Sequence, residues 1–151
     1  MNSKDWVLVT GVAGFIGSHI AEALLKKGFR IVGVDNFDSF YSKQVKEKNL
    51  EEIQKTSKRC GQQFRFINKD INDNIKSEFE KDSLISVIHL AGKAGVRPSL
   101  IDPEGYFRAN VNGTIQILEL AKSQGNIPVI FGSSSSVYGD DTQVQIGRAH
   151  V

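Results

Sequence analysis

The chain has 151 residues, of which 40% are hydrophobic and 24% charged, and a formal net charge of +2. These values are ordinary for a globular protein with room for one core. The sequence contains no single-sign charge block long enough to suggest a nucleic-acid-binding surface. No apolar run approaches the roughly 18 residues of a membrane span. The single Cys60 cannot form an internal disulfide, which predicts a reducing, cytoplasmic location. No cysteine and histidine residues have the spacing of a metal site.

Residues 6–17, WVLVTGVAGFIG, predict a buried strand, a tight turn and a helix in immediate succession. The apolar run ends at Thr10, and three glycines follow. Gly11 permits a sharp turn, Gly14 lets the backbone approach a phosphate, and Gly17 lets the helix pack against the strand. The spacing is GxxGxxG and not the best-known GxGxxG. Between a strand and a helix it nevertheless favours dinucleotide binding over a merely structural turn.

The next strand, Arg30–Asp35, ends in an acid at nearly the interval of about 20 residues expected for a ribose-binding carboxylate. A carboxylate there would repel a 2′-phosphate, so NAD is favoured over NADP. The alternative is a turn residue, since Asp-Asn is turn-prone. A charged helix follows, capped by Ser42 and ending near Lys58. On it, Lys43 could reach a cofactor phosphate or could simply be solvated.

Further strands are expected at 64–67, 86–91 and 128–131, and further helices at 74–81 and from Pro103 to about Gly125. Alternating strands and helices require parallel strands with right-handed crossovers. We therefore expect an α/β, doubly wound Rossmann sheet of strand order 3-2-1-4-5 that stops after the fifth strand. Ligands bind at the carboxyl ends of such strands. This edge of the sheet, the rim, is expected to carry all of the candidate ligand-binding segments: the glycine turn, Asp35, Asp70, residues 91–92 and the serines at 133–136.

Six motifs together resemble the extended short-chain dehydrogenase/reductase family, which includes NAD-dependent nucleotide-sugar epimerases and dehydratases. They are TGVAGFIGSH, VDNF, DI at 70–71, HLAG, NVNGT at 110–114 and SSSSVYG at 133–139, and the resemblance covers residues 6–144. FDSFY and AGVRPS look most similar to UDP-glucuronate 4-epimerases. UDP-galactose 4-epimerases and dTDP-glucose 4,6-dehydratases are rivals, but Ser135 and Ser136 stand where a dehydratase would carry Asp-Glu.

The resemblance implies an NAD site and a UDP-sugar site. The implied cofactor-binding residues are Gly11, Gly14, Phe15, Ile16 and Gly17 for the pyrophosphate, Asp35 and Asn36 for the ribose, Asp70 and Ile71 for the adenine, and Leu90, Ala91, Gly92, Asn110 and Ser133. Lys43 is a further cofactor-binding candidate from its position in the sequence alone. Ser134 is implied as the catalytic hydroxyl at the sugar 4-oxygen, and Arg97 as a substrate contact. The plainer alternatives are a structural amide at Asn110, a loop serine at Ser134 and a solvated arginine at Arg97.

The implied reaction is transient oxidation of the sugar to a 4-keto intermediate, followed by hydride return to the opposite face. The family's base is a tyrosine in a YxxxK pair, yet no tyrosine here is followed by lysine four positions later. The alternative function is therefore a non-catalytic NAD-binding protein. The resemblance also implies a homodimer for a full-length protein.

Residues 1–145 are expected to form an NAD-binding domain that is incomplete at its C-terminus. The last six residues, IGRAHV, can be back-translated as the start of a sequencing adapter. We therefore expect 146–151 to be a non-native tail on a fragment of a longer protein, and the fragment to be inactive.

Overall fold

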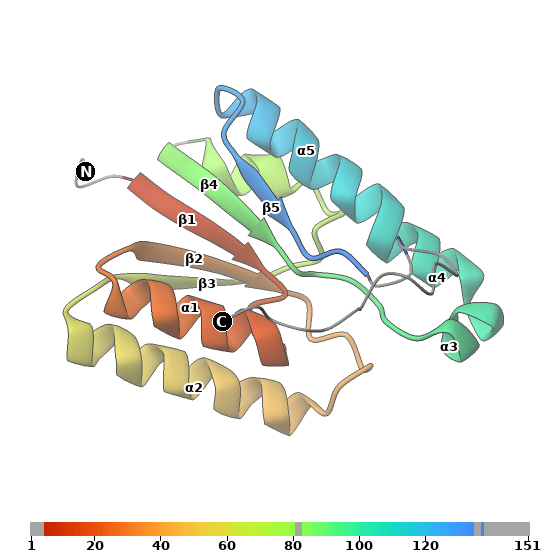
Figure 1. Cartoon of the computed structure of the whole chain (residues 1–151), viewed down its shortest axis with the longest axis horizontal. Helices are drawn as coiled ribbons and strands as arrows, with labels where there is room; N and C mark the ends of the chain where they lie inside the picture. The colour runs from red at the N-terminus through yellow and green to blue at the C-terminus, as the bar shows by residue number, and fades with distance from the viewer. Residues whose placement is uncertain (1–4, 81–82, 135–136, 138–151) are drawn as a thin grey trace, which may run out of the picture.

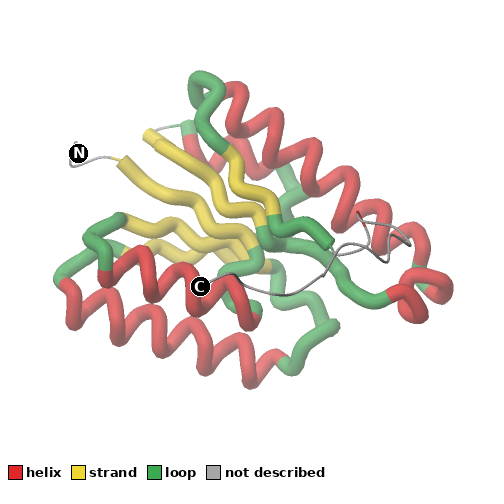
Figure 2. Tube along the Cα trace, viewed as in Figure 1, coloured by secondary structure: helices red, strands yellow, loops and turns green. Residues whose placement is uncertain are grey.

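A five-stranded parallel sheet forms the centre of the structure, a computed structural model that describes residues 5–80, 83–134 and 137. The strands lie in the order β3-β2-β1-β4-β5, and every neighbouring pair is parallel (Figures 1 and 2). Their bounds are β1 Asp5–Thr10, β2 Arg30–Asp35, β3 Phe64–Asn68, β4 Ser83–His89 and β5 Val129–Phe131. The predicted Rossmann topology and strand order are thus confirmed.

Helices cover both faces of the sheet. Helices α1 (Phe15–Lys26) and α2 (Lys43–Cys60) lie on one face, and the short 3₁₀ helix η1 (Ile75–Phe79) and α5 (Gly113–Ser123) lie on the other (Figure 1). Successive strand residues point to opposite faces, so β1 contributes Val7 and Val9 to the first core and Leu8 to the second. Burial on both faces explains why the central strands are continuously apolar.

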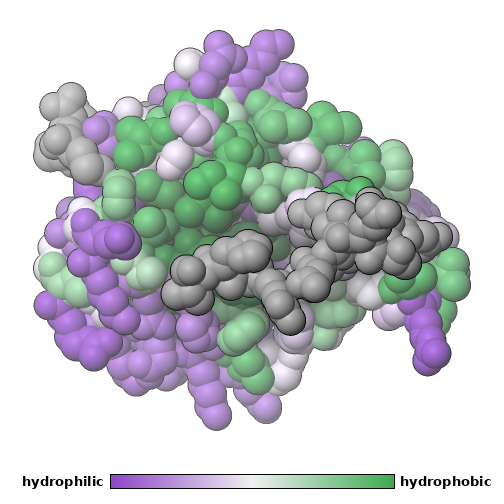
Figure 3. Space-filling model, viewed as in Figure 1, coloured by the Kyte–Doolittle hydropathy of each residue, from purple (hydrophilic) through white to green (hydrophobic). Residues whose placement is uncertain are grey.

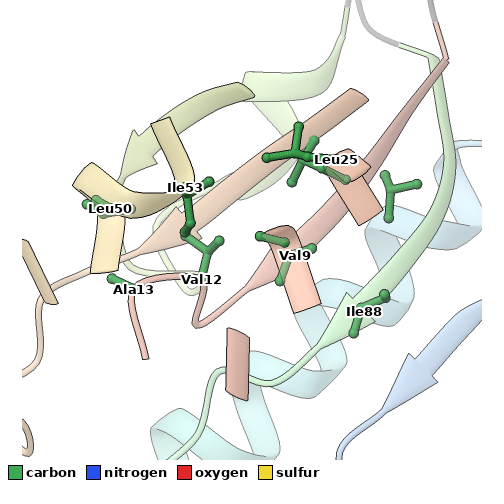
Figure 4. Close-up of a cluster of buried hydrophobic side chains, with 10 residues drawn as sticks. Val9, Val12, Ala13, Leu25, Leu50, Ile53 and Ile88 are labelled. Carbon is green, nitrogen blue, oxygen red and sulfur yellow. The ribbon is translucent and has the colours of Figure 1, made fainter. Parts of the chain in front are cut away.

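The core beneath α1 and α2 also supports the glycine turn. Figure 4 shows Val9 of β1, Val12 and Ala13 of the turn, Leu25 of α1, Leu50 and Ile53 of α2 and Ile88 of β4 gathered in one cluster. All seven are buried. The turn is consequently held in place by side chains packed directly below it.

Strand β4 ends two residues earlier than predicted, at His89 and not at residue 91. The amides of Leu90 and Ala91 donate to the Thr10 hydroxyl, each at 3.1 Å. Because these two donors are directed to a side chain, they are lost to the strand ladder. The segment predicted as a helix at 74–81 is only the five-residue η1.

The predicted helix from Pro103 is present but is not uniform. It consists of α4 (Pro103–Phe107), a π-helical turn η2 (Arg108–Asn112) and α5, which follow one another without a break. A short helix α3 (Val96–Ile101) precedes it and was not predicted, because none of its residues is buried and the sequence carries no apolar periodicity there.

Helix α2 begins as predicted after Ser42, which is its N-cap residue, but the serine caps it through its backbone and not through its hydroxyl. Its side chain makes no capping hydrogen bond, and its carbonyl oxygen instead accepts from the amides of Val45 and Lys46. The helix ends at Cys60 because Gly61 adopts a left-handed conformation with φ of +63°.

Apolar side chains are exposed over the outer part of the sheet. Figure 3 shows hydrophobic residues, in green, gathered between hydrophilic margins on the viewer's side. Ile130 of β5 is 61% exposed, whereas its neighbour Ile88 on β4 is 9% exposed. Among the described residues, no helix combines the length and hydropathy needed to cross a membrane.

Candidate functional site

The turn between β1 and α1 accepts only glycine at two of its three spaced positions. Gly11 has φ of +66°, and a Cβ atom there would lie 2.9 Å from the Ala91 amide nitrogen. A Cβ atom on Gly17 would overlap the carbonyl oxygen of Gly11. The predicted sharp turn and the predicted close helix packing are both confirmed. At Gly14 the nearest such contact, to the same oxygen, is 3.1 Å.

The N-terminus of α1 is open to a ligand. No described side chain caps the helix at Gly14, and its first turn carries no acidic residue. The first amides of a helix lack intrahelical partners and carry a partial positive charge. Phe15 and Ile16, which begin the helix, are 71% and 57% exposed. Their amides and the bare glycine turn fit a pyrophosphate.

Asp35 lies at the carboxyl end of β2 and bonds directly to the turn. Its Oδ2 accepts from the Ala13 amide at 3.2 Å, and its Oδ1 accepts from the Phe37 amide at 2.9 Å. The residue is only 6% exposed. Oδ2, with a single described donor, retains capacity for a further hydrogen bond such as one from a ribose hydroxyl.

A buried lysine that the sequence reasoning missed completes the Asp35 environment. Lys46 of α2 donates to Asp35 Oδ1 at 2.9 Å, and its side chain is 7% exposed. Lys43, the lysine that was predicted, is 74% exposed and pairs with Glu47 on its own helix at 3.6 Å. Lys46 shares the helical spacing of the buried Leu50 and Ile53, and this spacing was the signal that could have found it.

Asp70, beyond β3, faces the same rim. The side-chain amide of Asn36, Nδ2, donates to Asp70 Oδ2 at 3.2 Å, and this hydrogen bond links the ends of β2 and β3. Burial raises the pKa of Asp70, but hydrogen bonds from Asn72 and Asn36 and the charge of Arg108 outweigh it, so the pKa lies below its ordinary value. The neighbouring Ile71 is buried in the core, where it packs closely against Gly113 of α5.

A chain of hydrogen bonds joins the carboxyl ends of β1 and β4 to the π-helical turn. Thr10 Oγ1 lies 2.7 Å from His89 Nδ1, His89 Nε2 lies 3.1 Å from Thr114 Oγ1, and Thr114 donates to the Asn110 carbonyl at 2.6 Å. Thr10 already accepts two amides, so its one proton goes to Nδ1. His89 therefore carries its proton on Nε2 and is neutral.

Asn110 braces the loop that follows β4. Its Oδ1 accepts from the Lys93 amide at 2.8 Å, and its Nδ2 donates to the Lys93 carbonyl at 2.9 Å. A Cβ atom on Gly92 would lie 3.0 Å from the same Oδ1. Asn110 is exposed, and its side chain holds the backbone of Lys93, which agrees with the alternative of a structural amide. Its cofactor-binding role stays a prediction.

The substrate-side residues lie further along the same edge. Leu90 contacts Gly132 at the end of β5, and Ser133 and Ser134 follow directly and are exposed. Arg97 lies exposed on α3. The roles predicted for Ser133, Ser134 and Arg97 stay predictions. Ser135, Ser136 and Tyr138 of the same motif lie outside the described residues.

Comparison with known proteins identifies the family. The family of GDP-mannose 4,6 dehydratase matches residues 8–149. The chain belongs to this family. A UDP-glucuronate 4-epimerase of Thermodesulfobacterium geofontis is 42% identical over 135 residues, which make up 88% of this chain and 40% of that protein. UDP-glucuronate 4-epimerase 6 of Arabidopsis thaliana is 37% identical over 147 residues, 95% of this chain and 31% of that protein.

A solved structure of a similar protein shows the same arrangement. The UDP-glucuronic acid 4-epimerase of Bacillus cereus, a mutant in complex with UDP-4-deoxy-4-fluoro-glucuronic acid and NAD, superposes with a TM-score of 0.77 at 37% identity. The match covers 91% of this chain and 42% of that one. The predicted resemblance to NAD-dependent epimerases and dehydratases is confirmed. The chain spans about a third to two fifths of the length of these relatives.

The buried Asp35–Lys46 pair predicts a strong, partner-dependent effect on stability. We expect Asp35→Asn to lower the free energy of unfolding by about 3 kcal/mol, because it leaves the Lys46 charge buried without a counter-charge. The double variant Asp35→Asn/Lys46→Met should regain most of that loss. Urea unfolding at neutral pH measures both. Lys43→Met, at an exposed pair on the same helix, is the control and should change stability by less than about 0.5 kcal/mol. A double variant as unstable as Asp35→Asn would contradict the prediction.

His89 predicts a loss of stability in mild acid. Burial lowers its pKa from 6.5 to about 4, so between these values the unfolded chain binds a proton that the folded chain does not. The stability contributed by neutral His89 is therefore complete above pH 6.5 and is lost as the pH falls towards 4, by about 2 kcal/mol.

This effect is measured by chemical unfolding of the wild type and His89→Asn at pH 7.5 and pH 4.5. The other two histidines are common to both proteins, so their titration cancels. The stability advantage of the wild type should shrink by that amount at the lower pH. An advantage independent of pH would show that His89 is not held neutral.

Proposed function

We propose that this chain is the NAD-binding portion of a nucleotide-sugar 4-epimerase of the UDP-glucuronate or UDP-galactose type. The observation that carries the proposal is the glycine turn with the uncapped α1 N-terminus beside Asp35, at the edge where β1 lies between β2 and β4. The family match and the epimerase relatives support it.

The residues present fit NAD as cofactor. The bare turn at Gly11 and Gly14 would accept the pyrophosphate, and Asp35 Oδ2 would accept a hydrogen bond from the adenosine ribose. The buried carboxylate would repel a 2′-phosphate, which favours NAD over NADP. The structure in complex with NAD among the relatives supports this choice.

When bound, NAD supplies reversible hydride transfer at the sugar C4. In this proposal the Ser134 hydroxyl, exposed beyond β5, hydrogen-bonds the 4-oxygen as charge changes there, and Arg97 contacts the substrate. A 4,6-dehydratase is the second candidate, and the name of the matching family favours it. Ser135 and Ser136, at the positions of the dehydratase acid and base, favour the epimerase.

We also propose that the protein acts as a homodimer in the cytoplasm. An apolar stripe suited to a second copy runs along one side of the α4–α5 helix. It consists of four side chains that are 43–57% exposed, Phe107, Val111, Ile115 and Leu118.

The single cysteine fits a reducing compartment. Residues 1–145 are proposed as the NAD-binding domain and 146–151 as a tail without a role in it.

A charge placed at the α1 N-terminus tests the NAD site. We expect Ile16→Asp to raise the Kd for NAD about tenfold relative to Ile16→Asn, because its carboxylate repels the pyrophosphate and competes for the helix dipole. The two side chains have the same shape, and the acid is favourable at this end of a helix, so folding is preserved. Isothermal titration calorimetry gives both affinities. Equal Kd values would contradict the proposed pyrophosphate position.

Catalysis by the chain alone is a separate test. We expect the purified 151-residue protein with NAD to give no interconversion of UDP-glucuronate and UDP-galacturonate, because no YxxxK pair is present to supply the base. Chromatography of the sugar nucleotides measures it, with the wild-type Bacillus cereus epimerase as positive control. Turnover would show that another residue serves as the base.

A further inference from the structure

Lys93 connects two loops that belong to different strands. Its Nζ lies 3.1 Å from Asp102 Oδ2, in its own segment after β4, and 3.7 Å from Asp38 Oδ2, in the loop after β2. The side chains of Lys93 and Asp38 are only 23% and 35% exposed. The Lys93–Asp38 pair therefore lies between the loops, whereas Asp102, at 51% exposed, lies nearer the surface.

The position of this link follows from the strand order. Strands β2 and β4 are the two neighbours of β1 in the sheet. A contact between the loops that follow them bridges the two sides of β1, and the carboxyl end of β1 leads into the glycine turn. A hollow of about 240 Å³ opens at the link, with Asp38 and Phe40 on one side and Pro98 and Ile101 on the other.

Both ends of the link are held in position. The backbone of Lys93 is fixed by its two hydrogen bonds to Asn110, and Asp102 Oδ1 accepts from the Gly105 amide at 2.9 Å. On the other side, Asp38 Oδ1 accepts from the Phe40 amide at 2.9 Å. Each aspartate thus uses one oxygen for its own loop and presents the other to Lys93.

We propose that the Asp38–Lys93–Asp102 link is a latch over the glycine turn that slows the release of a dinucleotide bound beneath it. The inference rests on the proposed NAD site and adds to it a positioning residue, Lys93, whose ammonium group holds two loops together. None of the predicted cofactor contacts includes Lys93 or Asp38.

The strength of the link suits a latch. Ion pairs with partial exposure contribute modestly and are screened by salt, so the loops can part to admit or release a ligand. The hydrogen bond to Asp102 raises the pKa of Lys93 above its ordinary value, so the ammonium group is charged at neutral pH. The latch therefore responds to ionic strength and not to physiological pH.

The test measures release of NADH, chased from the full chain by excess NAD in a stopped-flow fluorimeter. We expect Lys93→Gln and Asp38→Asn each to raise the dissociation rate constant about fivefold. The double variant should be no faster than either single one, because both substitutions remove the same contact. Lys55→Gln, at an exposed pair with Glu52 on α2, is the control with the same loss of charge.

Two further readouts separate a latch from a general loss of structure. The ratio of the Lys93→Gln rate to the wild-type rate should fall towards one as sodium chloride is raised from 0.05 to 0.5 M. Without nucleotide, the amides of 37–41 should exchange hydrogen for deuterium faster in Lys93→Gln than in Lys55→Gln.

The outcomes are distinguishable. A wild-type chain that binds no NADH would overturn the proposed function and the latch with it. Binding with release rates unchanged in both variants would overturn the latch alone. Faster release in Lys93→Gln but not in Asp38→Asn would also overturn it, because Lys93 would then act on the cofactor phosphates directly.

Discussion

The close approach of three backbone segments at Gly11 is the constraint on which the rest of the structure depends. The Gly11 residue has a positive φ, its missing side chain leaves room for Ala91 after β4, and its carbonyl oxygen touches Gly17 of α1. A side chain at Gly11 or Gly17 would push β4 or α1 away from β1. The end of the central strand, the start of the first helix and the loop after β4 are thus fixed relative to one another, which places the candidate ligand-binding groups at one edge.

Side-chain hydrogen bonds extend this arrangement beyond the turn. Thr10 takes the two amides that would otherwise continue β4, and through His89 and Thr114 it reaches the π-helical turn that holds Asn110. Such π turns occur frequently at functional sites. Here the turn places Asn110 so that its side-chain amide hydrogen-bonds to the backbone of the loop after β4. The rim of the sheet is therefore positioned by side-chain hydrogen bonds as well as by apolar packing.

Local patterns predicted most of the fold. The bounds of β2 were correct because a short apolar run lies between a glycine and an Asp-Asn turn, and the order of all five strands followed from their alternation with helices. The end of β4 was missed because it depends on Thr10, about 80 positions earlier in the sequence. Lys46 was missed because a lysine in a highly charged helix is expected to be solvated, and the sequence does not reveal its contact with Asp35. Ser134 and Arg97 stay predictions, since no contact in the described structure tests their roles.

The burial of Lys46 against Asp35 has a consequence for how coenzyme preference can change. In a dinucleotide-binding protein whose ribose-facing acid is solvated, one substitution removes the repulsion of a 2′-phosphate. Here the acid also neutralises a cation inside the protein, so losing it alone leaves a buried charge. A path from NAD to NADP then requires a compensating change on α2, the helix that carries Lys46. Coenzyme preference therefore depends on the protein core, because a substitution of the acid must be accompanied by a second substitution inside the protein.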